Sequence, residues 1–539
     1  MTESTSSIHA RDPQGESPAA TDHFTGSPDA VGAHLEDAAH FPGGHADAIA
    51  RPRTEAEVAA LIVAATRVLP IGAQSSVTGG ATPDGGLILA TDRLNILEES
   101  GPDHVRAGAG VPLVTLQKFL ASRARWFPPV PTYNGAFVGG VVATNAAGAS
   151  TFKYGTTRAW VDALTVVLAC GHVLDVVRGQ TVSGGDGFEI VCAHGVRHVT
   201  PGAYRMPDVP KCSAGYFTGP DMDLIDLFIG AEGTLGVITD ARLRTLPAPP
   251  ALAIALVPAG TESAALALVG ELRAASQATW RARDPHGIDV AAIEMVDRRC
   301  LQILREDGVD RRNDVTIPAD AEVVLLIQCE LPAGTDSTRA FDEVASSLEP
   351  DAPDTPLVRI CQLLDRHGVL EHTELAMPGD ARRAEQLLAF REGVPEGVNR
   401  RIGEAKRSID ARIEKAAADM IVPFECFGEM MERYRDGYRR RGVDFAIWGH
   451  ISDGNVHPNA IPRSYDDVVA AKEAVIEFGR EVVRLGGSPL AEHGVGRSAV
   501  KQALLRELYG DAAVAEMRAI KQALDPEWKL APGVLFDRM

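Results

Sequence analysis

The chain has 539 residues, of which 45% are hydrophobic and 23% are charged, so it has a globular composition and is too long for one core. Its formal net charge of −20 argues against a nucleic-acid partner, because such proteins need a basic face. The seven cysteines include no CxxC pair, which fits reduced thiols in a cytoplasm and argues against a Cys-ligated iron–sulfur cluster or zinc ribbon.

Residues 1–33 are expected to be a disordered tail, because they are rich in small and polar residues and nearly free of large apolar ones. The tail has neither the apolar run of a secretory signal nor the basic character of a mitochondrial transit peptide. No stretch of the sequence suits a transmembrane segment. We therefore expect a cytoplasmic protein, and leave open a peripheral position at a membrane.

Residues 34–247 are predicted to form an α+β domain. Thr54 is a suitable N-cap and Glu57 completes a capping box, so a helix should begin at residue 55. A glycine-rich loop follows a short strand at 68–71. Further short strands are expected at 86–90, 105–109, 163–169, 172–177 and 235–243, with helices at 114–123 and 137–146.

Prolines around Ala248 mark a boundary, after which residues 248–485 are predicted to form a second α+β domain with an antiparallel sheet. It should contain a long strand at 321–331 and a helix from Ala381 to about Glu392, where Gly393 and Pro395 are expected to end it. A strand–turn–strand is expected near 445–462. Residues 486–539 should form helices at 498–509 and 511–524.

Three runs of small residues lie in the first domain, at 72–80, 138–148 and 228–238. Small residues let backbone N–H groups surround phosphate oxygens, and Ser75, Ser76 and Thr78 can add hydroxyl donors. The first run is neither a Rossmann loop nor a P-loop. Each run alone also fits a surface loop or tight helix packing. Together they favour a chain wrapped around a large, flat, phosphorylated ligand.

A second cluster is Trp448-Gly-His-Ile-Ser-Asp-Gly-Asn-Val-His-Pro-Asn459. If Asp453 and Gly454 form a two-residue turn, His450 and His457 lie opposite each other with their Cβ atoms about 4.5–5.5 Å apart. Two imidazoles so placed can share a divalent ion, whereas packing or surface display is the alternative for a lone pair. Glu492-His493, bracketed by glycines, offers another carboxylate and imidazole.

These runs and motifs, in this order, resemble the vanillyl-alcohol-oxidase and p-cresol-methylhydroxylase (PCMH) superfamily over roughly residues 34–536. Within it, the chain is similar to the branch of D-lactate, glycolate and D-2-hydroxyglutarate dehydrogenases. The resemblance implies a PCMH-type FAD-binding domain of two α+β subdomains, a substrate (cap) domain, and a helical C-terminal segment that packs back on the FAD-binding domain. The FAD should be non-covalent, because no histidine lies in the first loop or beside Gly139. The residues implied to bind FAD are Gly72, Ala73, Gln74, Ser75, Ser76, Thr78, Gly79, Gly80, Pro129, Thr132, Gly139, Gly140, Thr144, Gly148, Tyr154, Gly155, Glu232, Gly236 and Ile238.

The same resemblance implies oxidation of a small, anionic D-2-hydroxy acid to its 2-oxo acid, with hydride transfer to the flavin. The implied ligands of a divalent metal are His450, His457 and Glu492; zinc fits this set, and manganese or iron are alternatives. His493 is the implied general base, and Arg391, Lys415 and Asn459 are the implied anchors of the substrate carboxylate. Arginine suits that role because its fork matches a carboxylate. Some relatives have a threonine four residues after this arginine, where the chain has Pro395.

Two other functions remain compatible with the glycine-rich runs. One is a non-redox flavin transferase of the alkylglycerone-phosphate-synthase type, although its chemistry needs no metal motifs. The other is a subunit whose flavin only relays electrons within a larger complex. For a dehydrogenase, the electron acceptor stays open among quinone, cytochrome, electron-transferring flavoprotein and oxygen, as does a homodimer.

Overall fold

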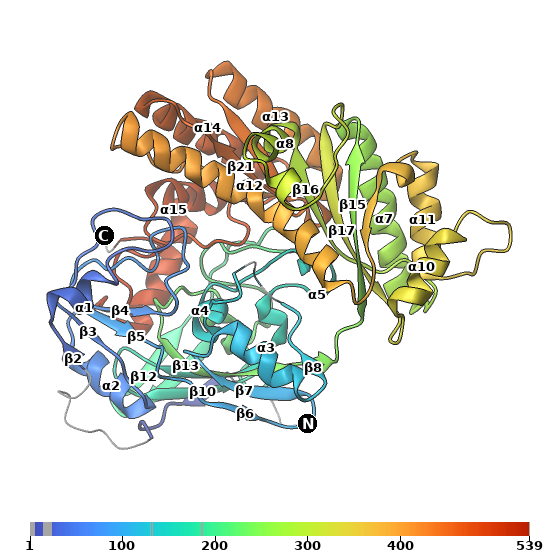
Figure 1. Cartoon of the computed structure of the whole chain (residues 1–539). Helices are drawn as coiled ribbons and strands as arrows, with labels where there is room; N and C mark the ends of the chain where they lie inside the picture. The colour runs from blue at the N-terminus through green and yellow to red at the C-terminus, as the bar shows by residue number, and fades with distance from the viewer. Residues whose placement is uncertain (1–5, 15–23, 130, 132, 185–186, 538–539) are drawn as a thin grey trace. The chain divides into compact units, whose positions relative to one another are not determined.

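The computed structural model describes residues 6–14, 24–129, 131, 133–184 and 187–537 (Figure 1). The chain forms two compact units. Unit 1 comprises Met1–Gly148, Gly155–Ala248 and Leu490–Met539, and unit 2 comprises Ala149–Tyr154 and Pro249–Pro489. Both units combine helices with sheets, which confirms the α+β class. Among the described helices, none has the length and apolar character needed to cross a membrane.

The first sheet of unit 1 has four strands in the order β2-β3-β5-β4, in which β5 is parallel to both β3 and β4. Helix α2 (Glu55–Ala64) begins as predicted, because the Thr54 hydroxyl accepts the N–H of Glu57 at 3.2 Å. Val58 and Ile62 of α2 are buried in a core that includes residues of β3, β4 and β5. The strands are β2 (Phe24–Thr25), β3 (Ala48–Ala50), β4 (Val68–Ile71) and β5 (Leu87–Ala90).

The second sheet of unit 1 is antiparallel, with the strand order β10-β9-β13-β7-β6. Two smaller sheets have the orders β1-β11-β12 and β14-β8. The strands of these three sheets are β1 (Ser7–His9), β6 (Leu97–Glu99), β7 (His104–Gly108), β8 (Arg125–Trp126), β9 (Val161–Val167), β10 (Val173–Val177), β11 (Phe188–Cys192), β12 (Gly195–Val199), β13 (Val237–Arg244) and β14 (Leu246–Pro247).

The expected disordered tail contains ordered structure in its described residues. Strand β1 pairs in parallel with β11, and Arg11 next to it forms ion pairs with Glu55 and Asp175. The expectation was therefore wrong for this segment, because a three-residue strand needs no core of its own when it extends an existing sheet edge. Residues 1–5 and 15–23 lie outside the described part.

The helices of unit 1 include the pair expected at 498–509 and 511–524. They form α15 (Ala499–Leu524), which is broken at Gly510, where φ is +80°. The remaining helical segments are α1 (Pro28–Gly32), α3 (Leu113–Ala121), α4 (Val138–Ala143), η1 (Thr157–Trp160) and α6 (Leu224–Phe228).

A buried lysine of α15 ties this C-terminal helix to the third small-residue run. Lys521 Nζ donates to Asp525 Oδ2 at 2.6 Å, to the carbonyl of Thr234 at 2.7 Å and to that of Leu530 at 2.8 Å. Burial lowers the pKa of Lys521. The ammonium is therefore held by three oxygens in a place that excludes water.

We expect Lys521→Met to lower the free energy of unfolding by about 3–5 kcal/mol, because it leaves the Asp525 carboxylate buried without its cation. Urea unfolding of the purified protein measures the loss. Adding Asp525→Asn to the lysine variant should recover part of it. If the Lys521→Met variant were as stable as the wild type, the hydrogen bonds of Lys521 would contribute little to stability.

Unit 2 is built on a seven-stranded antiparallel sheet with the order β18-β15-β17-β16-β20-β21-β19. Helices α8 and α12 share one hydrophobic core with residues of β15, β16 and β17 (Figure 1). The strands are β15 (Ala251–Ala259), β16 (Val290–Asp297), β17 (Val323–Leu331), β18 (Glu374–Ala376), β19 (Met420–Ile421), β20 (Phe445–Gly449) and β21 (Asn455–Ala460). The helical segments are α5 (Thr151–Tyr154), α7 (Glu262–Ala282), α8 (Arg298–Glu306), α9 (Val309–Arg312), α10 (Ser337–Ala345), α11 (Pro356–Arg366), η2 (Leu370–His372), α12 (Ala381–Ser408), η3 (Phe424–Cys426), α13 (Phe427–Arg440), η4 (Ile451–Asp453) and α14 (Tyr465–Arg484).

Helix α12 does not end near Glu392 as expected but continues through Gly393 and Pro395 to Ser408. Gly393 lies so close to Val309 that an added Cβ would be 2.8 Å from that side chain, so the glycine serves packing and not termination. The apolar face continues past the proline through Val398, which is fully buried. Tertiary packing thus outweighs the local cost of the proline, whose missing N–H deprives the carbonyl of Arg391 of its helical partner.

Candidate active site

A cavity of about 400 Å³ in unit 1 is lined by residues of all three small-residue runs. An added Cβ at Gly140 would meet no atom within 4 Å, so this glycine faces open space, and helix α4 presents backbone to the cavity. Such walls fit the large, flat, phosphorylated ligand that the sequence predicted. The predicted FAD residues that line the cavity are Gly72, Ala73, Gln74, Ser75, Ser76, Thr78, Gly80, Gly139, Gly140, Thr144, Glu232, Gly236 and Ile238.

The first loop, 72–80, is shaped by the chain segment that precedes it. Asp37 Oδ2 accepts the N–H of Gly79 at 2.7 Å, and the Gln74 amide donates to the carbonyls of His34 and Ala81, each at 2.9 Å. Gly79 has a φ of +77°. Gly79 and the Gln74 side chain therefore build the turn that presents the other residues of the loop. Burial raises the pKa of Asp37.

Several predicted FAD residues do not line this cavity, namely Gly79, Pro129, Gly148, Tyr154 and Gly155, and Thr132 lies outside the described residues. Tyr154 belongs to unit 2, where its hydroxyl donates to Glu330 Oε1 at 2.6 Å. The family resemblance implied a flavin contact for Tyr154. Residues 149–154 belong to unit 2, although the residues before and after them belong to unit 1, and no sequence pattern indicates this.

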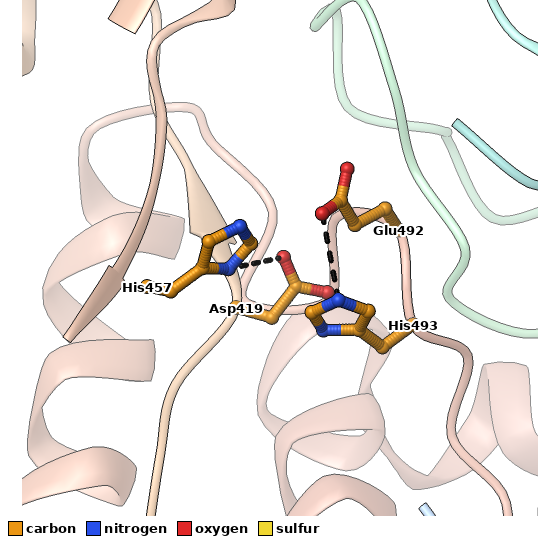
Figure 2. Close-up of side chains that lie close together, drawn as sticks. All are labelled: Asp419, His457, Glu492 and His493. Atoms are coloured by element: carbon orange, nitrogen blue, oxygen red, sulfur yellow. Dashed lines mark ion pairs between the residues drawn. The ribbon is translucent and has the colours of Figure 1, made fainter. Parts of the chain in front are cut away.

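Glu492 and His493 line the same cavity of unit 1. His493 Nε2 lies 3.4 Å from Glu492 Oε1, and a dashed line marks this ion pair in Figure 2. The second oxygen, Oε2, accepts from the Nζ of Lys211 at 3.0 Å, and this lysine side chain is fully buried. Sequence reasoning missed Lys211 because it stands in a loop with no motif around it. Unit 1 alone therefore places an imidazole and a carboxylate at the wall of the cavity.

Glu232 connects the third run to the loop that follows His493. Its carboxylate accepts the N–H of Val495 at 2.8 Å and that of Gly496 at 2.9 Å. Burial raises the pKa of Glu232 to about 7, although these two bonds favour the charged form.

This raised pKa predicts a pH dependence of stability in the FAD-free protein. Between about pH 4.5 and pH 7 the folded protein holds a proton on Glu232 that the unfolded chain has lost. The free energy of unfolding should therefore fall as pH rises through this window, by roughly 1–3 kcal/mol. Urea unfolding at pH 5 and pH 7 measures the slope. Glu232→Gln should flatten it and the exposed Glu36→Gln should not; an unchanged slope in the first variant would contradict this assignment.

In unit 2, the strand–turn–strand is present but its register differs from the expected one. Trp448, not His450, lies opposite His457, and the pairing continues to Phe445 opposite Ala460. The turn is longer than two residues, because η4 occupies 451–453 and the N–H of Asn455 closes the loop on the carbonyl of His450 at 3.2 Å. The two imidazoles remain neighbours, with ring centroids 5.5 Å apart and planes at 89°.

Three buried polar side chains alternate along β21, so Asn455, His457 and Asn459 share one face of the sheet. His457 Nδ1 lies 3.6 Å from Asp419 Oδ1 (Figure 2). Within the described residues, the amide oxygens of Asn455 and Asn459 have no hydrogen-bond partner. Buried polar atoms seldom lack partners, so this face is suited to a polar ligand. Asp419 is not among the ligands that the sequence predicts.

Arg391 and His450 meet on one buried carboxylate, that of Glu294 in β16. Glu294 Oε2 accepts from Arg391 Nε at 2.7 Å, and Oε1 accepts from His450 Nδ1. Burial alone would raise the pKa of Glu294, but the charges of Arg391 and His450 outweigh it and lower the pKa to about 2. Sequence reasoning missed Glu294 because it stands in a buried apolar strand.

The last predicted substrate anchor, Lys415, is exposed. It lies just before Ala417, which forms an isolated bridge with Asn459. Asn459 itself is buried, and its amide donates to the carbonyl of His457 at 2.9 Å. Arg391 and His450 thus both contact the carboxylate of Glu294. Asn459 and His457 lie on the same strand, β21.

The fold and the cavity lined by the small-residue runs fit an FAD-linked oxidoreductase, the class of protein that the comparisons with known proteins show. The model of the C-terminal domain of FAD-linked oxidases matches residues 260–535, and the model of an FAD-binding domain matches residues 46–176. The chain belongs to the family of FAD-linked oxidases.

Among curated proteins, the chain is 26% identical to the glycolate oxidase subunit GlcD of Bacillus subtilis, covering 91% of this chain and 89% of that protein. It is 27% identical to a D-lactate dehydrogenase of Archaeoglobus fulgidus, covering 91% of each. It is also 27% identical to a D-2-hydroxyglutarate dehydrogenase of Xanthomonas citri pv. viticola, covering 91% of this chain and 89% of that protein.

Two solved structures show the same fold at low sequence identity. A 4-ethylphenol oxidase from Gulosibacter chungangensis has a TM-score of 0.63 and 15% identity, covering 96% of this chain and 94% of that one. An alkyldihydroxyacetonephosphate synthase has a TM-score of 0.59 and 13% identity, covering 95% of this chain and 82% of that one.

Proposed function

We propose that the protein is an FAD-dependent dehydrogenase that oxidises the alcohol carbon of a small D-2-hydroxy acid to a 2-oxo acid. The observation that carries this proposal is the Glu492–His493 pair in the wall of the FAD cavity. An imidazole there can take a proton beside the redox cofactor. The three curated relatives, named for glycolate, D-lactate and D-2-hydroxyglutarate, support this substrate class. The proposal assigns residues 34–247 to FAD, 248–485 to the substrate and 486–539 to a segment that completes the FAD site.

The substrate carboxylate is proposed to bind Arg391. Its guanidinium has five N–H donors, and Glu294 takes the edge that includes Nε. That contact leaves the guanidinium fixed in orientation, as a clamp for a planar anion requires. Lys415 is the proposed additional contact to the carboxylate. The amide oxygen of Asn459, which has no partner within the described residues, is an acceptor, so we propose that it contacts the substrate hydroxyl and not the carboxylate that the sequence analysis assigned to it.

A divalent metal is the second proposed component, and the donor set suits it. In unit 2, Asp419 and His457 lie together and offer oxygen and nitrogen donors of the kinds that bind zinc or manganese, and in unit 1 Glu492 offers a carboxylate. We propose His450, His457 and Glu492 as the ligands, with Asp419 as a further donor beside His457. A metal in this set would lower the pKa of the substrate hydroxyl.

His493 is the proposed general base, because it is half-exposed and lies beside the carboxylate of Glu492. Bound FAD supplies the hydride acceptor. Lys211 donates to the second carboxylate oxygen of Glu492, Oε2, and so fixes the Glu492–His493 pair in place.

Anaerobic mixing of the FAD-loaded protein with D-lactate, glycolate or D-2-hydroxyglutarate tests the proposal. We expect one of them to bleach the flavin absorbance, with one equivalent of 2-oxo acid formed. A flavin that stays oxidised with every D-2-hydroxy acid would contradict the proposal. It would instead favour a non-redox flavin transferase, a chemistry that the same fold also carries. Fast bleaching without turnover on an artificial dye would indicate a subunit that needs a partner to pass on its electrons.

A further inference from the structure

We propose that Glu294 is a positioning residue that sets both the orientation of Arg391 and the tautomer of His450. This inference rests on the proposed function, in which Arg391 anchors the substrate carboxylate and His450 is a metal ligand. Glu294 stands in β16, and only 3% of it is exposed. Its two partners come from separate elements, α12 and the turn after β20.

Each oxygen of the Glu294 carboxylate has a different partner. Oε2 accepts from Arg391 Nε at 2.7 Å and also contacts Nη2, while Oε1 accepts from His450 Nδ1. Arg391 Nη1 is held at 3.0 Å by Glu392 Oε1. The guanidinium plane is therefore held from two sides, and its orientation does not depend on the substrate.

The bond to His450 fixes which ring nitrogen carries the proton. The guanidinium of Arg391 lies on the other oxygen of this carboxylate, and a carboxylate paired with a guanidinium accepts hydrogen bonds, so Nδ1 of His450 is the donor. In the neutral ring, Nε2 then keeps its lone pair, which is the form that can bind a metal ion. A carboxylate behind a metal-binding histidine commonly has this effect, and here the same carboxylate also holds the substrate anchor.

A purely structural ion pair would need only one of these contacts. Arg391 neutralises the charge of Glu294, and an arginine–glutamate pair would be complete without His450. The second contact instead links the two parts of the proposed site through a single side chain. Disturbing Glu294 should therefore affect metal binding and substrate binding in a pattern that depends on the replacement.

Glu294→Gln separates the two contacts. An amide has one acceptor and one donor atom, and Arg391 needs the acceptor. The amide nitrogen then faces His450 and donates to Nδ1, so the proton moves to Nε2 and the ring loses its ligand atom. We expect zinc affinity to fall about 10- to 100-fold. The KM for D-lactate, measured at saturating zinc, should change by less than about threefold.

Glu294→Ala removes both contacts, so zinc affinity should fall and the KM should rise at least tenfold. His450→Gln leaves Glu294 intact and should lose zinc affinity. Zinc affinity is measured by competition with a chromophoric chelator, alongside FAD content and the thermal midpoint. Glu343→Gln is the matched control, because Glu343 is a buried glutamate of unit 2 that contacts Arg339 and Thr355 instead.

The outcomes are distinguishable. If the wild type binds zinc and Glu294→Gln binds it equally well while folding and retaining FAD, the positioning role is overturned but the proposed function stands. Wild-type zinc affinity in His450→Gln would likewise overturn it, even if the Glu294 variants failed to fold. A wild type that binds no zinc and ignores chelators would remove the metal from the proposed function, and with it this inference. Failure of every hydroxy acid to reduce the flavin would instead refute the proposed function itself.

Discussion

Replacing His493 with alanine should lower kcat by about a hundred- to ten-thousandfold, the usual contribution of a general base. His493 lines the FAD cavity, and its Nε2 lies 3.4 Å from a carboxylate oxygen of Glu492. The side chain is more than one-third exposed, so its removal leaves no buried cavity and little loss of stability is expected. FAD content, from the absorbance of the purified protein, should stay at the wild-type level.

Two measurements separate this role from a general disturbance. Single-turnover flavin reduction by D-lactate reports the chemical step and should slow as much as kcat does. His198→Ala is the control, because this histidine is exposed on β12 of unit 1, away from the small-residue runs in the sequence. Undiminished flavin reduction in His493→Ala would eliminate this residue as the base.

Much of the FAD half could be predicted because its signals are local. The capping box at Thr54, the strand at 68–71 and the small-residue runs each depend on a few neighbouring residues, and each predicts backbone close to a ligand. Thirteen of the predicted FAD residues line one cavity for this reason. The break between the last two helices was equally local, since Gly510 is a poor helix residue.

The errors share a physical cause, which is that tertiary partners decide them. Pro395 does not end α12 because Gly393 and its neighbours pack on buried apolar side chains. The turn after His450 is longer than Asp453-Gly454 suggests because η4 itself is buried. Lys211, Glu294 and Asp419 stand in no motif. Each acquires its role only when a distant segment brings Glu492, Arg391 or His457 next to it.

Removal of the proposed divalent metal should abolish turnover, with a loss of at least a hundredfold that zinc or manganese restores. The expectation rests on the donor atoms of His457 and Asp419 in unit 2, and on the buried amide oxygens of the β21 face, which have no partner within the described residues. A metal at this face would supply charge stabilisation of several kcal/mol in the transition state. FAD should stay bound, because the three small-residue runs supply most of its cavity wall.

Dialysis against a chelator, followed by metal analysis and steady-state assays with D-lactate, gives the result. His457→Ala should reproduce the chelated state and should not be restored by added metal, whereas His493→Ala should still bind metal while remaining slow. The two variants together therefore divide the site into an ion-binding part and a proton-accepting part. If chelated protein contained no metal and turned over at the wild-type rate, the polar face of β21 would have to serve the substrate directly, through Asn455 and Asn459.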